Sequence, residues 1–151
     1  IMSHIFFEKN SNYLVAKSFN KDQFTIEVSY APESTQLELV FDPSEDYFEE
    51  LQEKLTTGEW EHFVLKVSAY YDGVEMASEY LGSNVSADPV DYINDDIVDY
   101  IADMVETVVK EARDLAYQKM AKMQEDFAYE FSLNDEIGSF VEKSAGNTLP
   151  K

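Results

Sequence analysis

Aspartates spaced four residues apart are the side chains in this sequence whose chemistry points most clearly to a function. They occur in a segment from Asp88 to about Met123 that has α-helical periodicity, and they share one side of it. Like charges at this spacing each cost a helix roughly a few tenths of a kcal/mol, and the helix dipole offsets only those in the first turn. We therefore predict a partner-binding row of carboxylates, formed by Asp91, Asp95, Asp99 and Asp103 with Asp96 and Glu106 beside it.

A second acidic helix face is predicted between Asp42 and Gly58. Asp42 followed by Pro43 is typical of a helix start, Glu45 stands where a capping box needs it, and Gly58 is typical of a helix end. We expect its outward-facing acids to contact the same partner; they are Asp46, Glu49, Glu50 and Glu53.

Two tyrosines beside the carboxylate row are candidate anchors for a partner. Tyr92 and Tyr100 would lie next to the acids on the predicted helix, and aromatic side chains often dominate the binding energy of interfaces. The alternative is that both rings flank the apolar stripe of the helix and serve its packing.

The residue types needed for catalysis are scarce. There are two histidines, His4 and His62, no cysteine, and five glycines that form no phosphate-binding loop. The acids from Asp91 to Asp96 lack the glycine of a calcium-binding loop, and no Glu-x-x-His motif of a di-metal site occurs. Two carboxylates could serve a glycosidase, but with so many acids a pair has no diagnostic value. We predict neither an enzyme nor a cofactor or metal site.

The charge of the chain restricts its partners. Asp and Glu number 31 against 11 Lys and Arg, which gives a formal net charge of −20. Such a charge repels nucleic acid and anionic membranes, so direct binding to either is not expected. A protein with a basic surface is the expected partner. The alternative is that the acids only keep the chain solvated.

Alternating and helical patterns indicate an α+β fold. We expect an antiparallel sheet of five or six strands, packed against the long helix and the shorter helix that begins at Asp42. Asp72-Gly73 is typical of a two-residue hairpin turn. Similar patterns near Phe24 and Phe63 also suggest a duplicated ββα unit. The expected strands are 4–8, 13–19, 24–30, 36–41, 62–71 and 74–81.

The C-terminal third is predicted to be mainly helical. The buried stripe of the long helix would consist of Ile93, Ile97, Ile101, Met104, Val108, Ala112 and Leu115. Uninterrupted to residue 131 this helix would be too long for a compact domain, so we expect a break, a bend or a projecting end between Arg113 and Asp126. A short helix would follow over 132–143. We predict one domain over residues 1–143 and a flexible tail over 144–151.

The Asp91–Glu106 and Asp46–Glu53 faces are the features that carry a resemblance to known proteins. In these features the chain resembles small acidic, cysteine-free proteins of phages and mobile elements that act as DNA mimics. This resemblance is to a functional class and covers about a quarter of the chain. It implies a non-enzymatic inhibitor that docks on the nucleic-acid-binding groove of a CRISPR effector or restriction nuclease. The N-terminus shows no signal-peptide pattern, and a cytoplasmic location is expected.

Self-association is the alternative function. A structural or assembly protein could form homo-oligomers through an irregular Met and aromatic segment near the C-terminus, although this segment could instead belong to the core. Its residues are Tyr117, Met120, Met123, Phe127, Tyr129 and Phe131.

Overall fold

The structure, a computed structural model, describes residues 12–145 as an α+β protein. The chain divides between Ala112 and Arg113 into two compact units. The expected single domain over residues 1–143 stays a prediction. The expected strand 4–8 lies outside the described residues.

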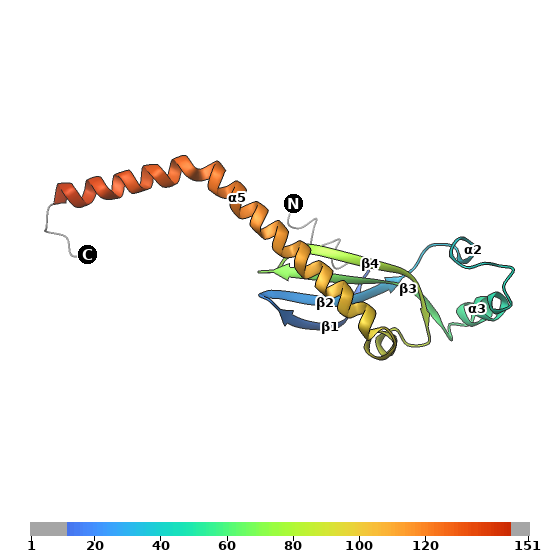
Figure 1. The fold of residues 1–151 in the computed structure, drawn as a ribbon. Helices are drawn as coiled ribbons and strands as arrows, with labels where there is room; N and C mark the ends of the chain where they lie inside the picture. The colour runs from blue at the N-terminus through green and yellow to red at the C-terminus, as the bar shows by residue number, and fades with distance from the viewer. Residues whose placement is uncertain (1–11, 146–151) are drawn as a thin grey trace. The chain divides into compact units, whose positions relative to one another are not determined.

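The first unit contains a four-stranded antiparallel sheet (Figure 1). Its strands follow chain order, so two hairpins lie side by side. Asp72 and Gly73 both have positive φ, as a two-residue hairpin turn requires, which confirms the prediction. Asp22 and Gln23 also have positive φ and make a second such turn that the sequence analysis missed. The strands are β1 (Leu14–Lys21), β2 (Phe24–Pro32), β3 (Glu61–Tyr71) and β4 (Val74–Ser86).

The expected strand 36–41 is absent, and this part of the fold prediction is wrong. The segment forms the short helix α2 (Leu37–Val40), closed by a hydrogen bond from Phe41 N to Leu37 O of 2.8 Å. A returning strand would have needed a free edge of β2. That edge is taken by β3, with Pro32 opposite Phe63, and the other edge is taken by β1. The suggested duplication of a ββα motif is therefore wrong, because the expected first copy, which begins near Phe24, has no second strand.

One face of the sheet packs against the start of the long helix α5 (Val98–Ala145). Paired residues of antiparallel strands lie on the same face, so the large apolar side chains of β2 and β3 form one continuous surface. The predicted buried stripe is confirmed between Ile93 and Ala112, with Ile97 partly buried. Residues fully or almost fully buried in this core include Ile26, Val28, Phe63, Leu65, Val67, Ile93, Ile101, Val105 and Val108.

The shorter helix α3 (Tyr47–Thr56) begins later than predicted. Asp42 does not cap it; its carboxylate instead accepts hydrogen bonds from Ser44 N and Ser44 Oγ, which makes a local turn. The turn uses the oxygen that a capping box would have offered to the first helical turn. The predicted stop is confirmed, because Gly58 has a φ of 80° and follows directly after the C-cap, Thr57.

In the second unit α5 remains helical from Arg113 to Ala145. No break of the helix occurs between Arg113 and Asp126, and the separate helix expected over 132–143 is part of α5. Ser144 and Ala145 of the expected tail are also helical, while residues 146–151 lie outside the described residues. The described side chains from Tyr117 to Phe127 are all exposed, so the core role considered for this segment is not what the structure shows.

A buried lysine lies on the face of the sheet that points away from α5. Lys66 is only 8% exposed, and its ammonium lies 3.0 Å from a carboxylate oxygen of Glu75. Rings of Tyr13 and Tyr80 lie 5.4 and 5.8 Å from the same ammonium. Burial opposes charging of both partners, but their pairing prevails: the pKa of Lys66 is raised and the pKa of Glu75 is lowered.

Replacing Glu75 with Gln should destabilise the protein by about 2 kcal/mol at neutral pH, because it leaves the Lys66 ammonium buried without its counter-charge. The partial exposure of Glu75 keeps this figure below the value for a fully buried pair. Since the folded pKa of Glu75 is lowered, its contribution is complete above the unfolded pKa of about 4.3 and is lost as the pH falls through the folded value. Urea denaturation at pH 7 and pH 3 measures both effects.

Two controls accompany this measurement. The double variant Lys66→Met/Glu75→Gln removes both charges, and should change the stability by less than about 1 kcal/mol. Glu79→Gln lies on the same strand but pairs in register with Val67, on the other face, and should change it little. Equal losses for Glu75→Gln and Glu79→Gln would contradict the assigned role of the ion pair.

Candidate protein-interaction surface

The carboxylate row begins where predicted but is divided by a π-helical turn. Asp88 caps the start, accepting hydrogen bonds from Val90 N and Asp91 N at 3.0 and 3.2 Å, with Pro89 at the first position of α4 (Pro89–Asp91). The turn η1 (Tyr92–Asp96) follows, and Ile97 then departs from helical geometry before α5 starts. The prediction of one uninterrupted helix from Asp88 is therefore wrong.

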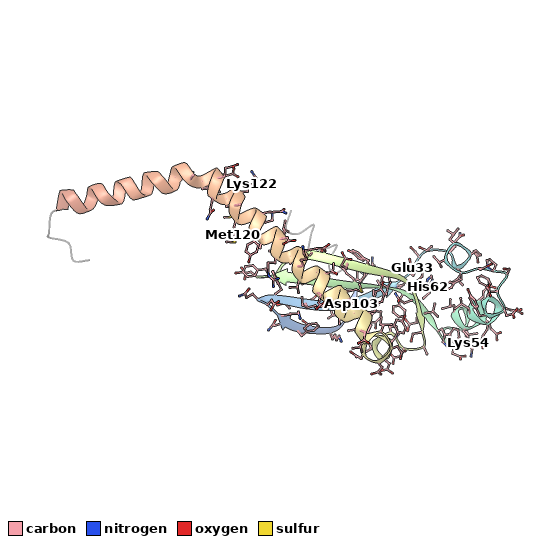
Figure 2. The ribbon with its side chains drawn as sticks, viewed as in Figure 1. Glu33, Lys54, His62, Asp103, Met120 and Lys122 are labelled. Carbon is pink, nitrogen blue, oxygen red and sulfur yellow. The ribbon has the colours of Figure 1, made fainter. Side chains whose placement is uncertain are left out.

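The extra residue in a π turn separates the acids into two groups. The first is the turn cluster, defined as Asp88, Asp91, Asp95 and Asp96. The second is the α5 face, defined as Asp99, Asp103 and Glu106, whose spacing of four and three keeps all three on one side of a regular helix (Figure 2 labels Asp103). In Figure 1 the turn is the yellow coil at the beginning of α5.

Two adjacent side chains hold the turn against the sheet. Ile93 is fully buried, and the ring of Tyr92 meets that of Phe63 edge to face at 5.5 Å. The Tyr92 hydroxyl donates to Asn84 Oδ1 at 3.3 Å, and Asn84 Nδ2 donates to the carbonyls of Phe63 and Leu81. Asn84 is buried in an irregular part of β4, so its amide satisfies backbone groups that the strand ladder leaves unpaired.

Because of this anchoring, the two tyrosines predicted to contact a partner differ in their accessibility. Tyr92 is half-buried and already occupied by Phe63 and Asn84, so its visible role is to position the turn cluster. Tyr100 is 53% exposed and lies on α5 between Asp99 and Asp103 in sequence. Of the pair, Tyr100 is the ring that the structure leaves accessible to a partner.

All six predicted carboxylates of the row are exposed. No Lys or Arg occurs in the sequence between Asp88 and Val109. Crowding of like charge has a direct consequence at the turn cluster: the nearby carboxylate of Asp88, followed by partial desolvation and by Asp95, raises the pKa of Asp91. The fold thus holds several negative charges close together at this turn.

The second predicted face is also exposed, on α3. Its four acids, Asp46, Glu49, Glu50 and Glu53, all reach solvent. Lys54, labelled in Figure 2, follows them, bonds to Glu59 and lies 5.7 Å from the centre of the Trp60 ring. Because the α3 and α5 faces come from different elements, they form two separate acidic surfaces.

An aromatic cavity beside α3 was not predicted. It measures about 420 Å³ and includes Glu50, one of the predicted acids. No local sequence pattern marks Phe41 or Trp60 as functional. Val85 and Ser86 of β4 come to lie beside them only in the folded protein. Its lining consists of Phe41, Tyr47, Glu50, Leu51, Trp60, Val85 and Ser86.

Glu33 was also missed, although it organises the loop next to this region. Its carboxylate accepts a hydrogen bond from Ser83 N at 3.0 Å, where Ser83 has a φ of 59°, and its own N–H donates to His62 O at 2.9 Å (Figure 2). Burial lowers the pKa of His62 against the opposing charge of Glu33. These contacts indicate a structural role for His62 at the start of β3.

Other kinds of site find no support in the part of the chain that the structure describes. No three His, Asp or Glu side chains there are grouped closely enough to hold a metal ion. No helix among residues 12–145 has both the length and the apolar content needed to cross a bilayer. Comparison with protein-family models, with curated proteins and with solved structures gives no match.

Asn84→Ala should lower the free energy of unfolding by about 2 kcal/mol, because it leaves a buried carbonyl, a partly buried carbonyl and a tyrosine hydroxyl without their partner. Tyr92→Phe keeps the ring contact with Phe63 and loses a single hydrogen bond, so about 1 kcal/mol is expected. Urea denaturation of the two variants tests the order. If Tyr92→Phe costs as much as Asn84→Ala, the amide does not connect the turn to the sheet as described.

Proposed function

We propose that this protein is a non-enzymatic inhibitor that binds the basic, nucleic-acid-binding groove of a partner protein. The partner class we name is a CRISPR effector or a restriction nuclease. One observation carries the proposal: Asp99, Asp103 and Glu106 lie together on an exposed side of α5, in a stretch of sequence without Lys or Arg.

The spacing on α5 suits such a groove. Asp99 and Asp103 are separated by about 6 Å of helix rise, and the buried side of the helix packs against the sheet. Proteins that bind nucleic acid line their grooves with Lys and Arg, which neutralise closely spaced phosphates. A fixed series of carboxylates can take the place of phosphates there, and its field accelerates association.

The remaining acids extend this surface. The turn cluster adds charge at the start of α5, and Tyr100 offers a large ring next to it. The α3 face, with Asp46, Glu49 and Glu53 exposed, would meet a second basic region of the same partner. The alternative is that the acids only solvate the protein. In that case, partner binding would not depend on which acids are replaced.

Replacing both Asp99 and Asp103 with Lys should abolish binding of the partner protein. The bait is the full chain, exposed to a nuclease-rich bacterial lysate and eluted with a salt gradient, with bound proteins identified by mass spectrometry. The unchanged protein should release nucleic-acid-binding proteins between about 0.2 and 0.5 M salt, since such contacts weaken steeply with ionic strength. The reversed protein should retain none of them, and DNA should compete with the unchanged protein.

The matched control reverses Glu38 and Glu61, two exposed acids outside both faces, and changes the net charge by the same amount. It should keep the partner. A second readout is thermal stability at low salt, which should rise by about 0.5 kcal/mol in the Asp99/Asp103 variant as like-charge repulsion is relieved. Retention of the partner by the Asp99/Asp103 variant, or its loss by both variants, would refute the proposed docking surface.

Self-association remains the second candidate function, because the Met and aromatic segment of α5 is exposed. Tyr117, Met120, Met123 and Phe127 are between 42% and 62% exposed and recur at spacings of three and four, so they form one apolar side of the helix. Such a stripe is typical of a helix that pairs with another helix. The side chains of Tyr129 and Phe131 lie outside the described residues.

If this stripe mediates homo-oligomers, Met123→Glu should convert them to monomers, as measured by sedimentation equilibrium at several protein concentrations. Gln124→Glu introduces the same charge one position away and should leave the association constant within about twofold. A monomer for the unchanged chain at high protein concentration would exclude self-association, and would leave the acidic-face proposal untouched.

A further inference from the structure

The cavity beside α3 is lined mainly by apolar side chains, and the one charged group in its lining is a carboxylate. The lining includes the aromatic rings of Phe41, Tyr47 and Trp60, together with the aliphatic side chains of Leu51 and Val85. The carboxylate belongs to Glu50, an exposed residue in the first turn of α3.

Contacts between these residues hold the cavity in shape. Phe41 and Tyr47 meet edge to face at 6.4 Å, and Phe41 also contacts the ring of His62 at 6.1 Å. Leu51 is 5% exposed and attaches α3 to the rest of the unit. Trp60 N donates to Lys54 O at 3.1 Å, which fixes the chain just after the end of α3. The rings are therefore positioned before any ligand arrives.

The charge around the cavity selects the sign of its ligand. Glu49 and Glu53 flank Glu50 on α3, so an anionic ligand would be repelled. The chain already shows that this surface attracts a cation: the Lys54 ammonium lies over the Trp60 ring, and its hydrogen bond to Glu59, followed by the charges of the nearby glutamates, raises its pKa.

We propose that this cavity binds an arginine side chain projecting from the basic surface of the partner. The alkyl stem would lie against Leu51 and Val85, the guanidinium would stack on the aromatic rings, and Glu50 would accept its hydrogen bonds. Arginine fits better than lysine, because its planar, weakly hydrated head group stacks on rings and bonds a carboxylate in two places. This inference rests on the proposed function, in that the partner presents basic residues, and it adds a specific anchoring pocket to a diffuse acidic surface.

The experiment uses the single tryptophan of the chain, Trp60, which lies in the cavity wall. Intrinsic fluorescence of the full-length protein is followed during titration with N-acetyl-arginine amide, and in parallel with N-acetyl-citrulline amide, which has nearly the same shape and no charge. A saturable change with a Kd on the order of millimolar is expected for the arginine probe, with citrulline at least tenfold weaker. Equal affinity for the two probes, or no change with either, would overturn the proposal.

A pair of variants separates the cavity from the general charge of α3. Glu50→Gln should weaken arginine binding at least fivefold, whereas Glu53→Gln, which removes the same charge from the same helix outside the cavity wall, should stay within twofold. Circular dichroism checks that both variants fold. Equal weakening by both would show diffuse attraction only and would also overturn the proposal.

The outcome is independent of the α5 experiment. A protein with Asp99 and Asp103 reversed should bind the arginine probe as well as the unchanged protein does, because neither residue lines the cavity. Failure of the titration together with successful capture of a partner would remove the cavity and leave the α5 face. The converse result would leave an arginine-binding cavity without the proposed inhibitor function.

Discussion

The packing of α5 on the sheet is the constraint on which the rest of the first unit depends. Val108 and Ile101 must enter the surface formed by Val28 and Val67, and this fixes which side of the helix faces solvent. The solvent side then consists of whatever remains, and in this chain it carries carboxylates. Burial of the apolar stripe stabilises the helix enough for repelling charges to be tolerated on the other side, where they are worth only tenths of a kcal/mol each.

The same constraint explains why the turn before α5 is irregular. Ile93 is fully buried and Tyr92 reaches both Phe63 and Asn84, so adjacent residues must contact the sheet at different heights. A π turn contains an additional residue and supplies that freedom. The π turn also affects the proposed binding surface. The acids no longer form one line, because the turn cluster is separated from the α5 face, and a partner would contact two groups of charge.

Charge alone would make a poor recognition surface, since exposed ion pairs contribute little and are screened by salt. Apolar contacts that exclude water around a few charged pairs are what usually give an interface its affinity. Tyr100 beside the α5 face and the cavity around Trp60 beside the α3 face offer such contacts. In the proposed complex the carboxylates would direct the encounter, and these aromatic elements would hold the partner once it had arrived.

Local pattern in the sequence determined the features that depend on neighbouring residues. These include the Asp88 cap, the Asp72-Gly73 turn, the exposed acids and the apolar stripe of α5, because caps, turns and helix faces are set within a few residues. Tertiary structure alone decided the rest. Residues 36–41 alternate as a strand does, yet the segment is helical because both edges of β2 are occupied. The π turn exists because Tyr92 finds its partners on β3 and β4, and the cavity exists because Phe41, Trp60 and Val85 meet only in the folded chain. Which edges are free, and which distant residues meet, is a property of the whole fold that no local window of sequence contains.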